Sequence, residues 1–216
     1  MLISSYSDSV YPMLTKTKEQ EIEAYLPANC AQIVNRWLNF PNVKLRISRH
    51  RSSKLGDYRL LYGGKQHVIS VNGTLNKYAF LLTLVHEIAH MHVYMNLGNK
   101  VKPHGQEWKN EFKLLMSEFD MPVVFPEDLI SKIETYMGNP KASSSSDVQL
   151  SLAFRNYDAQ SDDSVVLSDI SIDTLFVTLS GRIFLKGPRQ RKRYKCKEVK
   201  SGRLYLFSPI TEVTPG

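Results

Sequence analysis

The histidines of this chain gather in one stretch, LLTLVHEIAHMHVYMNLGNKVKPHGQEW, which runs from Leu81 to Trp108 and holds four of the six. Two of them enclose a glutamate in the order H-E-I-A-H. Because a helix turns about 100° per residue, His86 and His90 would project from one face and could bind the same Zn²⁺. Zinc lowers the pKa of water that it binds to about 7, and Glu87 would lie where it can accept the proton. The order H-E-x-x-H therefore predicts a hydrolytic metal site.

The surroundings of this motif are apolar. A pattern with three fixed letters also occurs by chance on surface helices, where two stray histidines do no chemistry. Here the neighbouring residues predict a largely buried helix: Leu81, Leu82, Leu84, Val85, Ile88 and Ala89. Burying two histidines and a glutamate costs free energy unless they are paired or bind a metal, so the sequence favours zinc binding.

A catalytic zinc usually has three protein ligands, so a third must come from elsewhere. The metzincin pattern requires a glycine three residues and a histidine six residues after the second histidine. Val93 and Asn96 occupy those positions, which excludes that class. His92 would lie about 200° around the helix from His90, so we expect it to be a surface or core residue.

The remaining candidates for the third ligand follow the Gly98 turn. His104 would begin the next helix, and Pro103 and Gly105 beside it would let the chain return closely to the metal. Glu107 and Glu111 would instead supply a glutamate from a downstream helix, as in gluzincins. We favour His104, with Glu107 as the alternative, although a glutamate at a helix N-terminus more often stabilises the helix dipole.

Alternation, helical spacing and turn residues predict an α+β scaffold for these residues. The prediction is a small antiparallel sheet packed on helices, with strands at 43–48, 58–62 and 67–71 and helices after Pro27 and at 76–97, 105–119 and 127–137. Because residues 67–71 lead into the motif helix, we expect them to be an edge strand that binds a peptide by β-augmentation.

The composition changes at Gly138. Residues 138–165 are Ser-rich and then acidic, which is typical of a linker. Residues 166–216 read as a small, basic, β-rich domain with strands at 171–179, 182–186, 194–199 and 203–208. The sequence thus predicts one large domain at 1–137, a linker, and a second small domain.

Basic residues are dense in this second domain, in a chain with a formal net charge of +7 and a pI near 9.3. Cations beside an aromatic ring on β-strands suit single-stranded nucleic acid, with charges on phosphates and the ring on a base. A solvated, lysine-rich edge strand is the plainer interpretation. The candidate nucleic-acid contacts are Lys186, Arg189, Arg191, Lys192, Arg193, Tyr194 and Lys195.

H-E-I-A-H followed by P-H-G-Q-E-W strongly resembles the SprT-like zinc metallopeptidase domain, the group that includes the eukaryotic protease Spartan. KLGDYR and VISVNGTLN before the motif helix are laid out similarly, so the resemblance covers about residues 20–135. It implies a zincin-like fold with His86, His90 and His104 as zinc ligands and Glu87 as general base. It also implies cleavage of proteins crosslinked to DNA, with DNA as the recruiting partner.

The tail departs from that family. Many SprT-like proteins carry a zinc ribbon with four cysteines, and RKRYKCKEVKSGRLYLF resembles its second hairpin with Cys196 alone. We therefore expect one zinc per chain and a tail held by apolar packing of four aromatic residues: Phe176, Phe184, Tyr205 and Phe207.

Several classes are disfavoured. Two distant cysteines make no disulfide framework, the start lacks a secretory signal, and no apolar run is long enough to span a membrane. We therefore expect a cytoplasmic or nucleoid-associated zinc metalloprotease acting on DNA-associated or DNA-crosslinked proteins. The alternatives are a zinc protease with no DNA coupling, and a non-catalytic nucleic-acid-binding module whose zinc serves stability only.

Overall fold

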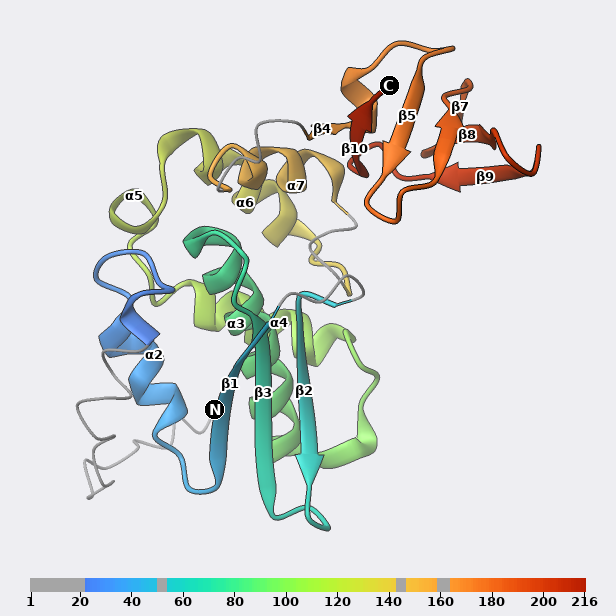
Figure 1. Ribbon diagram of the computed structural model, residues 1–216. Helices are drawn as coiled ribbons and strands as arrows, with labels where there is room; N and C mark the ends of the chain where they lie inside the picture. Colours follow the sequence, from blue (N-terminus) through green and yellow to red (C-terminus); the bar gives the residue numbers. More distant parts are fainter. Residues whose placement is uncertain (1–21, 50–53, 143–146, 159–163) are drawn as a thin grey trace. The chain divides into compact units, whose positions relative to one another are not determined.

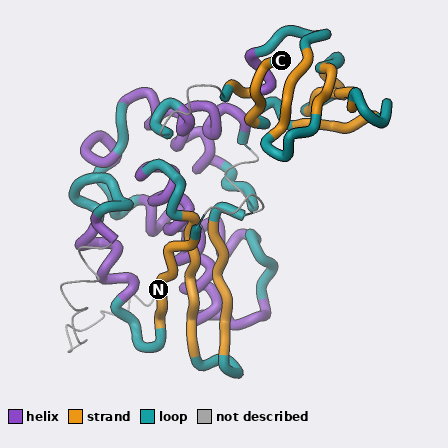
Figure 2. The backbone as a smooth tube through the Cα atoms, viewed as in Figure 1, coloured by secondary structure: helices purple, strands orange, loops and turns teal. Residues whose placement is uncertain are grey.

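The structure, a computed structural model, describes residues 22–49, 54–142, 147–158 and 164–216 (Figure 1). The chain divides into two compact units, Met1–Ser144 and Ser145–Gly216. Each unit combines helices with a sheet, as the tube in Figure 2 shows, so the predicted α+β class is confirmed.

The first unit contains a three-stranded sheet in the order β1-β3-β2. Its strands are β1 (Val43–Ser48), β2 (Gly56–Leu61) and β3 (Gln66–Asn72). β2 is antiparallel to β3, as predicted from the glycine hairpin, whereas β1 is parallel to β3. The sheet is therefore mixed, and the expectation that residues 67–71 form a peptide-binding edge is wrong, because β1 and β2 occupy both sides of β3.

The motif helix, α3 (Lys77–Leu97), packs against this sheet (Figure 1). The Asn76 side chain begins it by accepting hydrogen bonds from the N–H groups of Tyr78 and Ala79. Gly98, with φ of 66°, ends it, as predicted. Most side chains from Ala79 to Val93 are buried, so the helix is apolar around its whole circumference and lies in the core.

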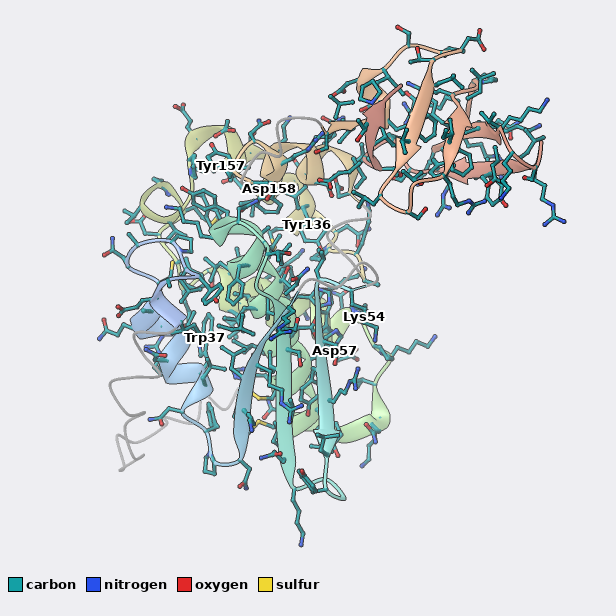
Figure 3. The ribbon with its side chains drawn as sticks, in the orientation of Figure 1. Trp37, Lys54, Asp57, Tyr136, Tyr157 and Asp158 are labelled. Carbon is teal, nitrogen blue, oxygen red and sulfur yellow. The ribbon has the colours of Figure 1, made fainter. Side chains whose placement is uncertain are left out.

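The other helices of this unit complete the core. They are α2 (Ala31–Leu38), the 3₁₀ turn η1 (Gly98–Lys100), α4 (Gln106–Met116), α5 (Met121–Val124) and α6 (Glu127–Gly138). α2 buries Val34, Trp37 and Leu38; Trp37 is labelled in Figure 3. α4 packs on α3 and ends at Met116, three residues before the predicted end. Pro122 lies in the first turn of α5, where its missing N–H is harmless.

The second unit is a seven-stranded sheet preceded by a helix. Its elements are α7 (Val148–Arg155), β4 (Val165–Val166), η3 (Leu167–Asp169), β5 (Leu175–Thr178), β6 (Ile183–Leu185), β7 (Arg189–Gln190), β8 (Arg193–Glu198), β9 (Leu204–Phe207) and β10 (Glu212–Pro215). The strand order is β4-β10-β5-β6-β8-β7, with β9 also paired to β8. The sequence missed the short strands β4, β7 and β10.

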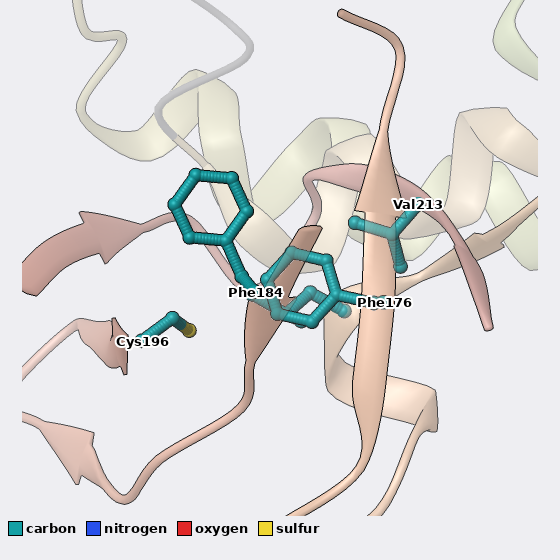
Figure 4. Close-up of a cluster of buried hydrophobic side chains, with 5 residues drawn as sticks. Phe176, Phe184, Cys196 and Val213 are labelled. Carbon is teal, nitrogen blue, oxygen red and sulfur yellow. The ribbon is translucent and has the colours of Figure 1, made fainter. Parts of the chain in front are cut away.

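Apolar packing holds this unit together, as predicted. Phe176, Phe184, Cys196 and Val213 form a buried cluster with Leu167 (Figure 4). Tyr205 and Phe207 pack against it, and the two rings of Phe176 and Phe184 stack with centroids 5.6 Å apart. The single cysteine is therefore one more small apolar side chain of the core.

The linker predicted at 138–165 is wrong for part of its length. α6 includes Gly138, and residues 148–155 form α7. The Asp147 carboxylate caps α7 by accepting from Leu150 N–H, and Leu150 and Phe154 are buried. The Ser-rich and acidic composition on either side hid this eight-residue helix; residues 143–146 and 159–163 lie outside the described part. Among the described helices, none is long and apolar enough to cross a membrane.

Candidate metal centre

Three histidines from two segments converge in the first unit. α3 carries His86 and His90 on one face, and His104 arrives from the loop between η1 and α4. His104 adopts φ of 59°, a left-handed conformation that costs a non-glycine residue about 1 kcal/mol or more and is concentrated at functional sites. Gly105 follows it because a side chain there would lie 2.9 Å from the carbonyl oxygen of Lys102.

The distances between the three ring nitrogens fit a metal ligand set. His86 Nε2 lies 3.1 Å from His104 Nε2 and 3.3 Å from His90 Nε2. His90 Nε2 lies 2.9 Å from His104 Nε2. Nitrogens bound to a tetrahedral Zn²⁺ at its usual bond length would lie about 3.3 Å apart. Three ring nitrogens at these separations can share one cation, so the residues present fit a metal ion.

The protonation states of these rings also suit a metal. Burial, together with the neighbouring rings of His90 and His104, lowers the pKa of His86 to about 3. Burial and His104 lower the pKa of His90 to about 4, and burial also lowers the pKa of His104. All three imidazoles are therefore neutral near pH 7, the form in which histidine binds metals.

One tryptophan packs against all three histidines. The Trp108 ring centroid lies 4.5 Å from that of His86, 5.3 Å from that of His90 and 4.8 Å from that of His104. Its Nε1–H donates to the carbonyl oxygen of His86 at 3.3 Å, and the side chain is only 1% exposed. Trp108 therefore fixes the orientation of the ligand rings from outside the ligand set.

Glu87 lies in the same cavity as the histidines. The cavity measures about 480 Å³ and its lining includes β2, α3, the His104 loop and the end of α6: Lys54, Leu55, Gly56, Asp57, Tyr58, Leu82, Thr83, His86, Glu87, His90, Pro103, His104, Phe112, Tyr136 and Ala142. Lys54, Asp57 and Tyr136 are labelled in Figure 3. Glu87 lines this cavity and is only 6% exposed.

The other candidate ligands stand apart from the cluster. His92 Nδ1 lies 2.8 Å from Glu111 Oε1, so these two residues contact each other, and His92 is a partly buried residue, as expected. Neither Glu107 nor Glu111 belongs to the group of three whose ligand atoms lie within 4.8 Å of one another. The structure therefore brings together His86, His90 and His104.

Three residues of the site went unassigned in the sequence. Trp108 lies on the buried face of α4 with Phe112 and Leu115, and apolar spacing alone does not distinguish a residue that contacts the histidine rings. Gly56 and Tyr136 reach the cavity through tertiary packing, from an edge strand and from the end of α6. No local sequence pattern predicts that these two residues lie at the cavity.

The basic residues of the second unit that were predicted to contact nucleic acid differ in their exposure to solvent. Arg189, Arg191, Lys192 and Arg193 are exposed in and beside the turn between β7 and β8, and Lys195 is partly exposed. Lys186 is wrong as a nucleic-acid contact, because it is 2% exposed and its Nζ donates to the carbonyl oxygen of Ile170 at 2.5 Å.

Tyr194 is similarly engaged. The Lys186 ammonium lies 4.0 Å from the Tyr194 ring centroid, and that ring also packs against the buried cluster. The lysine and the tyrosine thus contact each other, and strand alternation places Tyr194 on the same side of β8 as the buried Cys196.

Comparison with known proteins locates the likeness in the first unit. Residues 24–125 match the model of the SprT-like family, a span that includes the sheet, α3, the His104 loop and α4. No curated protein and no solved structure matches the chain. The match ends before α6 and does not reach the second unit. The family match and the convergence of His86, His90 and His104 identify the same helix and loop, so residues 24–125 form an SprT-like segment.

Proposed function

We propose that this protein is a zinc-dependent metallopeptidase with one zinc per chain, held by His86, His90 and His104. The observation that carries the proposal is the convergence of three neutral imidazoles in a cavity that also holds the Glu87 carboxylate. A site serving only stability would be closed by a fourth protein ligand, and the described residues offer no fourth side chain in the group.

The chemistry divides between the metal and the chain. Zinc, when bound, supplies a Lewis acid that activates water and polarises a carbonyl group. Glu87 accepts a proton from the attacking water at a carboxylate oxygen and returns it to the leaving amine. His86 and His90 would hold the zinc from α3, and Trp108 keeps their rings in place.

The outer edge of β2, to which none of the described strands is paired, is our candidate for binding the substrate backbone. Asn72 N–H donates to the carbonyl oxygen of Leu55, so Gly56 and Val71 form a non-hydrogen-bonded pair of the antiparallel ladder. The N–H and C=O of Gly56, and by alternation those of Tyr58, therefore point away from β3. Both residues line the cavity, so a peptide added to this edge would run past Glu87.

We further propose DNA-associated or DNA-crosslinked proteins as substrates, with single-stranded DNA as the partner of the second unit. The exposed side chains of Arg189, Arg191, Lys192 and Arg193 support this, because they offer four cations in one short hairpin. A cytoplasmic or nucleoid-associated location would fit such substrates.

The test compares wild type with Glu87→Gln, both verified to hold one zinc, on a protein crosslinked to single-stranded DNA and on the same protein free. We expect wild type to cleave the crosslinked protein faster and Glu87→Gln to cleave neither. The glutamine keeps the shape of the side chain but cannot accept the proton.

Each other outcome removes a defined part of the proposal. Equal cleavage of both substrates removes the DNA coupling and leaves the peptidase. Cleavage by Glu87→Gln at the wild-type rate removes Glu87 as the base. No cleavage by zinc-loaded wild type, with or without DNA, favours a nucleic-acid-binding module with a zinc for stability.

A further inference from the structure

We propose that Gly56 is a positioning residue for Glu87: the absence of a side chain at residue 56 lets β2 lie directly against the carboxylate and fixes where that carboxylate can stand. This inference deepens the proposed function and rests on it. Gly56 begins the edge strand β2, and Glu87 lies in the middle of α3, so the contact joins two elements that both line the cavity.

The space around Gly56 leaves no room for a methyl group. A Cβ built there would lie 2.7 Å from Thr83 Cγ2, 3.0 Å from Glu87 Cγ and 3.0 Å from Glu87 Oε1. Carbon atoms in ordinary contact are about 3.5–4.0 Å apart. Thr83 and Glu87 are one helical turn apart on α3, so the same face of the helix meets the strand at both residues.

Backbone conformation does not explain this glycine. Gly56 is absent from the glycines with positive φ, which are residues 63, 64, 98, 181 and 202. Any amino acid could adopt its extended backbone, and the paired residue on β3 is an ordinary valine, Val71. Size alone therefore requires glycine, and the size limit is set in part by the carboxylate.

The same residue faces the substrate path. Its N–H and C=O point away from β3, as the pairing of Asn72 with Leu55 requires. A substrate strand paired at Gly56 would thus lie next to the base. A side chain at this residue would push the Glu87 carboxylate aside or lift β2 from α3, and either change would separate the base from the bond to be cleaved.

The experiment measures kcat, KM, bound zinc and Tm for Gly56→Ala on the protein substrate that wild type cleaves. The matched control is Gly138→Ala, because a Cβ at Gly138 meets nothing within 4 Å and its φ is not positive. We expect Gly56→Ala to keep its zinc and lose about 100-fold in kcat, the scale expected for displacing a catalytic group by about 1 Å. KM should change much less, and Gly138→Ala should match wild type.

A second variant separates positioning from a general packing defect. Thr83→Ser removes the methyl group that a side chain at residue 56 would meet first, while leaving the contact with Glu87 in place. In the Gly56→Ala background we expect Thr83→Ser to restore Tm but not kcat. If Gly56→Ala alone does not fold, the double variant carries the test, and its kcat relative to Thr83→Ser decides.

Two results would overturn the inference: wild-type kcat in folded, zinc-loaded Gly56→Ala, or recovery of kcat together with Tm in the double variant. Both leave the proposed peptidase intact, because wild type would still cleave. Failure of the proposed function itself looks different, since zinc-loaded wild type would then cleave nothing and the Gly56 variants would have no activity to lose.

Discussion

Replacing Trp108 with phenylalanine should weaken zinc binding from outside the ligand set. The change deletes the Nε1–H bond to the carbonyl oxygen of His86 and part of an indole whose centroid lies 4.5–5.3 Å from the centroids of all three ligand rings. A hydrogen bond of this kind contributes about 1 kcal/mol, and the vacated volume adds to that loss. Because loss of such supporting contacts typically costs 10- to 100-fold in affinity, we expect the zinc Kd of Trp108→Phe to rise by about that factor.

The chain offers a matched control in its other tryptophan. Trp37 is 4% exposed, its Nε1–H donates to Glu118 Oε1 at 3.3 Å, and it packs edge-on against Phe119. Trp37→Phe therefore removes a comparable indole hydrogen bond from the same unit, at a residue that is not in ring contact with His86, His90 or His104. Zinc affinity is measured by competition with a chromophoric chelator, and the free energy of unfolding of the metal-free proteins by urea titration.

We expect both variants to lose about 1–3 kcal/mol of stability, and only Trp108→Phe to lose zinc affinity. Wild-type affinity in Trp108→Phe would refute the reasoning that this indole holds the ligand rings. Equal losses of affinity in the two variants would also refute it, because the effect would then follow general stability rather than contact with the rings.

Three further predictions follow from the same contacts. The pKa of His86 is lowered to about 3 in the folded protein, so the unfolded chain binds more protons at this residue. The metal-free protein should therefore lose stability as the pH falls below about 6.5, by about 2 kcal/mol at pH 5 from this residue. Urea titrations at pH 8 and 5 should show a smaller pH effect in His86→Gln than in wild type, and equal effects would contradict the assignment. Replacing Arg191, Lys192 and Arg193 together with alanine should reduce the slope of log affinity for single-stranded DNA against log salt by up to about 2. Lys186→Ala should lower Tm and leave this slope unchanged, because Lys186 is buried. The reverse pattern would refute the division between exposed and buried cations. Phe184→Ala should destabilise the second unit by about 3–5 kcal/mol without altering zinc affinity, which calorimetry of the zinc-loaded protein would check; loss of bound zinc would contradict the separation of the two units.

Local patterns predicted much of the first unit. The predicted first residue of α3, Asn76, is the N-cap, one residue before the helix begins. The i, i+4 spacing of the motif histidines and the Gly98 stop located α3, since each acts within one or two turns of the helix. The hairpin at residues 63 and 64 located β2 and β3 for the same reason. The order of the strands could not be obtained this way, because whether β3 lies at the edge or in the centre depends on where β1 pairs, which is a long-range choice.

The site shows the same limit. His86, His90 and Glu87 share one helix, so their relation follows from helical geometry, whereas the third ligand had to be chosen among candidates across a loop. The positive φ of His104 and the close approach of Gly56 to Glu87 are tertiary facts with no sequence period. Lys186 was misassigned because a lysine in a basic run looks exposed; its burial follows from its contacts with Ile170 and the Tyr194 ring.

The most direct test of the proposed chemistry follows oxygen from water into product. Zinc-loaded wild type and Glu87→Gln with equal zinc content are incubated with a protein substrate in water enriched in ¹⁸O, and the new C-termini are weighed by mass spectrometry. We expect one ¹⁸O in the new carboxylate for wild type and no new C-termini for Glu87→Gln. Labelled products at equal rates from both proteins, or none from zinc-loaded wild type, would contradict the proposed chemistry.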